Sequence, residues 1–175
     1  TDLALADKEV NSEVHQQVAL QASREGLVLL KNDKNLLPLD KSKIQRIAVC
    51  GPNADEASFA LTHYGPVAVE VTTVLDGIKE GTEVTYTKGC DLVDANWPES
   101  EIMPYPLTTE EKEGIQQAVD NVKESDVAIV VLGGGIRTCG ENKSRTSLDL
   151  PGRQQQLLEA IVETGKPVVL VLING

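Results

Sequence analysis

Short apolar runs alternate with stretches of helical periodicity along most of the chain. Apolar runs bounded by turn residues are typical of buried strands, and apolar residues every three or four positions are typical of amphipathic helices. The pattern predicts four strands, at 47–50, 84–87, 127–132 and 168–173. It predicts helical segments within 12–30, at 73–79, from Thr108 onward and at 153–164.

Three of these strands are apolar on both faces and are separated by helices, which is typical of a parallel sheet covered on both sides. We therefore expect an α/β fold, a mostly parallel sheet flanked by helices in a three-layer, Rossmann-like sandwich. Because the last apolar run, 168–173, would otherwise leave an uncovered strand edge, we interpret the sandwich as incomplete and the sequence as part of a longer chain.

Local signals place several helix ends. Ser12 suits an N-cap, and Thr108 with Glu111 three residues later forms a capping-box pattern. Pro151 suits a first helical turn, and Gly165-Lys166-Pro167 would stop the helix that follows it.

Composition narrows the function classes. The chain has 175 residues, of which 41% are apolar and only 3% aromatic, so one domain with an aliphatic core is expected. With 16 basic and 27 acidic residues the net charge is −11, which argues against nucleic acid or an anionic membrane surface as a partner. The three cysteines, Cys50, Cys90 and Cys139, form no CxxC pair, so the sequence predicts neither a metal site nor a cofactor.

The long polar segment 133–152 is the strongest candidate for a functional site. It is rich in glycine, it lies between a predicted buried strand and a predicted helix, and Glu141 stands near its middle. Such loops are uncommon without a function, and in open α/β sheets ligands bind beyond the carboxyl ends of the strands. Gly133-Gly134-Gly135 could be a phosphate-binding turn, but the spacing is not G-x-G-x-x-G, and a tight turn out of the sheet is the better interpretation.

Other loops carry weaker signals. The segment 51–55 could line a site at the same sheet edge as Glu141, although its composition favours a plain turn after a strand. A ligand contact at 63–65 has little support. Trp97 could form a sugar-stacking platform, but a loop tryptophan more often covers local core.

Three ordered blocks of sequence resemble glycoside hydrolase family 3. The segment from Glu141 to Gln154 is similar to the family pattern Glu-Gly-x-Asp-Arg-x-x-Leu-x-Leu-Pro-Gly-x-Gln, with matches at Glu141, Arg145, Leu148, Leu150, Pro151, Gly152 and Gln154. Residues 22–39 resemble the segment that leads from the family's first domain into its second. Residues 47–55 resemble the first strand of the second domain and its loop.

The resemblance implies a retaining, exo-acting β-glycosidase, with β-glucosidase favoured, that hydrolyses terminal β-linked sugars of an oligosaccharide or glucoside. Residues 1–40 would be the interdomain connection and leading helix, and residues 41–175 the start of the α/β sandwich. The nucleophile would be an aspartate on a preceding barrel domain of the same protein, and Glu141 falls at the position of the general acid/base. No substrate-binding residue is assigned.

The sequence differs from the family pattern at two positions close to Glu141. Asn142 stands where glycine is usual, and Ser144 stands where aspartate is usual. Lys143 and Arg145 flank Glu141, and nearby cations favour the ionised form of a carboxyl, whereas a general acid must hold its proton. We therefore expect Arg145 to point elsewhere, as an anchor for the loop. The alternative hypothesis is a non-catalytic Rossmann-like module that binds a nucleotide or a sugar.

Overall fold

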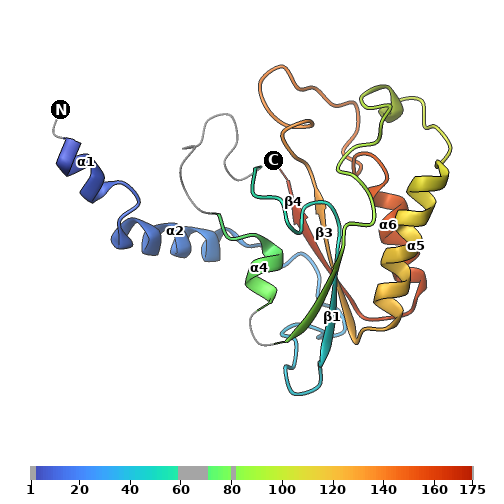
Figure 1. Ribbon diagram of the computed structural model, residues 1–175, viewed down its shortest axis with the longest axis horizontal. Coiled ribbons are helices and arrows are strands. Elements are labelled where there is room, and N and C mark those ends of the chain that lie inside the picture. The colour runs from blue at the N-terminus through green and yellow to red at the C-terminus, as the bar shows by residue number, and fades with distance from the viewer. Residues whose placement is uncertain (1–2, 59–70, 80–81, 175) are drawn as a thin grey trace. The chain divides into compact units, whose positions relative to one another are not determined.

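The computed structural model describes residues 3–58, 71–79 and 82–174, and it divides into two compact units, Thr1–Pro38 and Leu39–Gly175 (Figure 1). The first unit holds helix α1 (Leu3–Glu9) and helix α2 (Glu13–Gly26). Ser12 is the N-cap of α2, as predicted, with extended backbone angles but no capping hydrogen bond from its side chain. Further on, Asn32 both donates to and accepts from the backbone of Leu37, which closes a turn.

The second unit contains a parallel four-stranded sheet with the order β2-β1-β3-β4. Its strands are β1 (Arg46–Cys50), β2 (Glu83–Thr87), β3 (Val127–Gly133) and β4 (Val168–Ile173). All four predicted strands are thus confirmed to within one residue. The two buried central strands, β1 and β3, are the most uniformly apolar, as expected for strands with helices on both faces.

The helices of this unit are α4 (Val74–Ile78), α5 (Thr109–Lys123) and α6 (Gln154–Glu163). The capping box of Thr108 and Glu111 is formed at the start of α5. One expectation was wrong: Pro151 lies in the turn before α6 and not in its first turn. The reason is Gly152, whose φ of +60° is left-handed and cannot belong to a right-handed helix. A short 3₁₀ helix, η1 (Glu99–Glu101), also interrupts the segment 91–106 that we expected to be loop throughout.

Two apolar clusters fill the space on either side of the sheet, which confirms the three-layer arrangement. On one face, Ala118 of α5 and Leu157 of α6 pack against alternate residues of β1 and β3. The other face is covered by α4 (Figure 1). Leu75 of α4 packs there with the remaining residues of these strands and with β4. Cys50 is fully buried in the first cluster and behaves as a small apolar residue, and burial raises its pKa to about 12.

Because all four strands are parallel, the chain leaves β1 and β3 at the same edge of the sheet. The long segment 133–152 and the segment 51–55 therefore begin side by side. None of the described helices combines the length and the apolar character that crossing a lipid bilayer requires.

Candidate active site

The long loop begins at Gly133, where the backbone passes too close to β4 for any side chain. Gly133 has a φ of +141°, and a Cβ atom there would lie 2.0 Å from the carbonyl oxygen of Ile173. The next residue continues this contact, since Gly134 N donates to the same carbonyl at 2.9 Å. Close backbone packing therefore explains Gly133, which agrees with the tight turn preferred from the sequence. At Gly134 and Gly135 a Cβ would instead meet side chains, those of Cys139 at 2.9 Å and Leu92 at 2.3 Å.

A buried amide side chain holds this start of the loop. Gln154, at the first turn of α6, accepts a hydrogen bond from Gly133 N at 2.8 Å through its Oε1. Its Nε2 donates to the carbonyls of Gly133 at 2.9 Å and Leu92 at 2.8 Å. The side chain is fully buried, so these three bonds satisfy groups that water cannot reach. The sequence matched Gln154 to a family pattern but gave it no role.

The loop after β1 also contacts the start of the long loop, at Gly134. Asn53 is buried, and its Nδ2 donates to the carbonyl of Gly134 at 2.7 Å. Its Oδ1 is also buried and has no hydrogen-bond partner among the described residues. The segment 51–55 thus contacts the base of the long loop, whereas the segment 63–65 lies outside the described residues.

A tight turn from Gly135 to Cys139 follows the first glycines. The hydroxyl of buried Thr138 accepts from Gly135 N at 3.0 Å, and the backbone N–H groups of Thr138 and Cys139 donate to the carbonyl of Gly135 at 2.9 and 3.0 Å. The loop is therefore a defined structure up to Cys139, which is itself half-buried.

Glu141 lies at the exposed tip, between two residues with left-handed backbone. Gly140 has a φ of +129° and Asn142 a φ of +64°, and Lys143 N closes the turn by donating to the carbonyl of Gly140 at 3.1 Å. Asparagine is among the few residues other than glycine that adopt this conformation readily. The departure at Asn142 from the family's glycine therefore has a physical explanation, whereas nothing in the structure explains Ser144.

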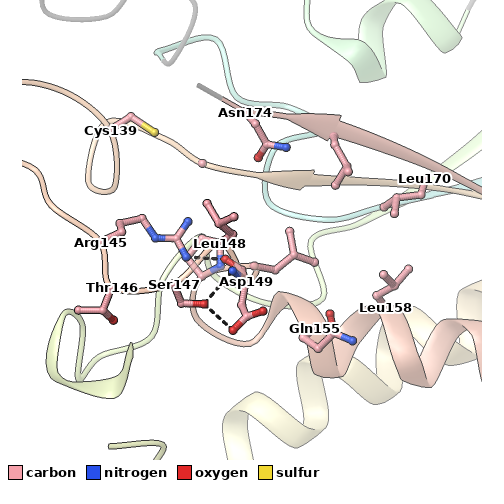
Figure 2. Close-up of a pocket in the computed structure, with 14 residues that line it drawn as sticks. Cys139, Arg145, Thr146, Ser147, Leu148, Asp149, Gln155, Leu158, Leu170 and Asn174 are labelled. Atoms are coloured by element: carbon pink, nitrogen blue, oxygen red, sulfur yellow. Dashed lines mark hydrogen bonds between the residues drawn. The ribbon is translucent and has the colours of Figure 1, made fainter. Parts of the chain in front are cut away.

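Arg145 anchors the returning side of the loop, as expected. Its Nε donates to Glu101 Oε1 at 3.2 Å and its Nη2 donates to the carbonyl of Asp149. Its guanidinium carbon lies 5.7 Å from the centre of the Trp97 ring, within the range of a cation–π contact. Figure 2 shows Arg145 extending toward Asp149 beside the returning chain. The Trp97 ring therefore faces the cation of Arg145.

The partner of Arg145 was missed from the sequence. The Glu101 side chain is almost wholly buried, and it also accepts hydrogen bonds from Thr146 N at 3.2 Å and Ser147 N at 3.3 Å. Burial acts to raise the pKa of Glu101, but the hydrogen bonds from Thr146, Arg145 and Ser147 outweigh it and hold the pKa below its usual value. Glu101 is therefore an ionised group that binds the loop.

An apolar hollow lies beside the returning chain, between α6 and β4 (Figure 2). Its volume is about 690 Å³, and its walls include Leu148, Leu150, Leu158, Leu170 and Leu172. Glu141 is not among the residues that line it. Over the part of the chain that the structure describes, no group of three or more histidine, cysteine or acidic residues is placed to hold a metal ion.

The fold and the site together define an α/β sandwich that presents a carboxylate on a long loop beyond the carboxyl ends of its strands. Residues 27–175 match the glycosyl hydrolase family 3 C-terminal domain, and the chain belongs to this family. It is 40% identical to a β-xylosidase from Formosa agariphila over 95% of this chain and 22% of that protein. It is 35% identical to a periplasmic β-glucosidase from Salmonella typhimurium over 97% of this chain and 23% of that protein.

Solved structures give the same assignment. A β-glucosidase from Erythrobacter marinus superposes with a TM-score of 0.84 at 32% identity, over 100% of this chain and 25% of that one. A β-glucosidase from Listeria innocua in complex with isofagomine superposes with a TM-score of 0.74 at 27% identity, over 94% of this chain and 21% of that one. The chain thus spans about a fifth of the length of the curated relatives it matches.

Proposed function

We propose that this chain is part of a retaining, exo-acting β-glycosidase and that Glu141 is its general acid/base. The observation that carries the proposal is the backbone at the loop tip. Glu141 is held between two left-handed residues in a closed turn, at the position that corresponds to the acid/base in the family motif. The names of the relatives, β-glucosidases and β-xylosidases, support terminal β-linked glucose or xylose as the substrate class.

A retaining mechanism requires two carboxyl groups about 5–5.5 Å apart on either side of the scissile bond. In the proposed enzyme, an aspartate of a barrel domain attacks the anomeric carbon while Glu141 donates its proton to the departing glycosidic oxygen. Glu141 then takes a proton from the water that hydrolyses the glycosyl-enzyme intermediate. An exposed tip on a fixed base suits this role, because the acid must reach a substrate bound on another domain.

The division of the chain belongs to the same proposal. Residues 1–40 would connect the barrel to the sandwich, and residues 41–175 would begin the sandwich. The apolar residues Val14 and Val18 of α2 are exposed in this chain, which supports a role for this helix in packing against another part of the full-length protein.

The test is Glu141→Ala in the full-length protein, assayed on p-nitrophenyl and dinitrophenyl β-glucosides and β-xylosides and on unactivated disaccharides. We expect kcat/KM on the disaccharides to fall by about 10²–10⁴-fold, the usual contribution of general acid catalysis. Dinitrophenolate leaves without protonation, so formation of the glycosyl-enzyme from the dinitrophenyl glycoside should be nearly unaffected. Added azide should restore turnover by attacking the intermediate in place of activated water.

The matched control is Glu113→Ala, which removes a similarly exposed glutamate from α5 and should leave all these rates unchanged. A Glu141→Ala enzyme that loses activity equally on every leaving group, without azide rescue, would rule out the acid/base role.

A further inference from the structure

The hydrogen bonds among the described residues attach the loop that carries Glu141 to the domain at two separate places. Its outgoing side is fixed at Gly133 and Gly134 by Gln154 and Asn53. Its returning side is fixed at 145–147 by Glu101, which lies in η1, 44 to 46 residues earlier in the chain. Glu141 lies between these two attachments.

The second attachment depends on a carboxylate. Oε1 of Glu101 accepts hydrogen bonds from Arg145 Nε and Ser147 N, and Oε2 accepts from Thr146 N. All three partners are donors, so both side-chain oxygens must be acceptors. A glutamine here would turn its amide NH₂ toward at least one N–H group and lose that hydrogen bond. The buried position makes this loss costly, because water does not replace the missing partner.

We propose that Glu101 is a positioning residue for the acid/base, which it serves by fixing the returning side of the loop; this inference rests on the function proposed above for Glu141. Glu101 itself touches the loop backbone and Arg145 and has no role in proton transfer. Displacement of a reacting group by about 1 Å can cost about 10²-fold in rate, so the loss of this anchor should affect the step that needs Glu141.

The test uses Glu101→Gln and Glu101→Ala in the full-length protein, alone and combined with Glu141→Ala. For Glu101→Gln we expect kcat/KM on unactivated disaccharides to fall by about 10–10²-fold and on dinitrophenyl glycosides by less than about threefold. In the Glu141→Ala background the same substitution should cost less than about twofold, because residues that act through one another are not additive. The control is Glu99→Gln, two residues earlier in η1 and exposed, which should change neither rate.

Two results would overturn the positioning role. One is an equal fall in kcat/KM of Glu101→Gln on disaccharides and on dinitrophenyl glycosides. The other is a double variant in which Glu101→Gln lowers kcat/KM as much as it does when Glu141 is present. If Glu101→Ala does not fold, Arg145→Lys tests the same contact from the other side, because lysine keeps the charge but lacks the Nε donor. Arg145→Lys should then show the same dependence on the leaving group, and its absence would also refute the proposal. The Glu141→Ala enzyme alone tests the function on which the inference rests, so the two failures are distinguishable.

Discussion

The base and the tip of the long loop differ in what fixes them. At the base, Gly133 and Gly134 are buried and are held by contacts from β4, α6 and the loop after β1. At the tip, the residues from Gly140 to Ser144 are exposed, and the hydrogen bond from Lys143 N to the Gly140 carbonyl closes the backbone turn. Both parts need left-handed backbone, but for different reasons: close packing at the base and the turn itself at the tip.

This difference indicates how the backbone around an exposed carboxylate such as Glu141 can be held in one conformation. Ordering a backbone costs roughly 1–2 kcal/mol for each residue, and an exposed tip buries little surface to offset that cost. The fixed base and the contacts of Glu101 hold the residues on either side of the tip, so fewer residues of the loop bear this cost. Substitutions at the base should therefore act mainly on stability, and substitutions at the tip mainly on activity.

The largest effect is expected for Gly133→Ala. The new Cβ would lie 2.0 Å from the Ile173 carbonyl oxygen, at a φ of +141° that alanine rarely adopts, so β3 and β4 would have to separate. We expect a loss of about 4 kcal/mol in the free energy of unfolding, because strain and the disrupted sheet add together. Thermal or urea unfolding of the protein measures this loss.

The matched control is Gly77→Ala, since a Cβ at Gly77 would meet nothing within 4 Å and the residue lies inside helix α4. This change should be neutral or stabilise the protein by up to about 1 kcal/mol. If the two alanine variants unfold alike, the close approach at Gly133 does not fix the loop base.

The next largest effect is expected for Gln154→Leu, which keeps the side-chain volume but removes three buried hydrogen bonds. The N–H and carbonyl of Gly133 and the carbonyl of Leu92 would lose these partners, and we expect a loss of roughly 3 kcal/mol. Unfolding experiments should show this against Gln155→Leu, whose wild-type side chain is exposed and bonds Glu159 one turn along α6. The control should change stability by less than about 0.5 kcal/mol, and similar losses in the two variants would refute the role of Gln154.

Much of the fold could be predicted because its signals are local. The strand from Val127 and the helix after Thr108 follow from apolar periodicity and a capping pattern, each of which spans a few residues. The helix predicted at 153–164 is α6 to within one residue, but Pro151 was wrongly expected in its first turn, because the left-handed angle of Gly152 cannot be known from its neighbours alone.

The contacts that hold the long loop in place could not be predicted in the same way. Glu141 and its loop were found from a motif, and an anchoring role was expected for Arg145. Glu101, the partner of Arg145, lies 44 residues from it in the sequence, and Asn53 lies 81 residues from its partner Gly134. Polar contacts between residues so far apart leave no periodic pattern in the sequence. The sequence around Glu101 also gives no sign that its side chain differs from that of the exposed Glu99, two positions earlier. Only the fold distinguishes the buried carboxylate from the exposed one.

The smallest effect on stability is expected at the tip, for substitutions of Asn142. Asn142→Gly removes the amide side chain but keeps a residue that adopts left-handed backbone, whereas Asn142→Val introduces a residue that does not. Glycine suits the φ of +64° at least as well as asparagine, so stability should change by less than about 0.5 kcal/mol. Valine is β-branched, and a left-handed conformation costs it about 1–2 kcal/mol or shifts the turn. Since Glu141 is the neighbouring residue, a shifted turn would move the acid, and we expect Asn142→Val to lose far more activity on unactivated disaccharides than on dinitrophenyl glycosides. If glycine and valine are equally active on the disaccharides, the left-handed turn does not position Glu141, and the contrast between a packed base and a tip fixed by its backbone fails.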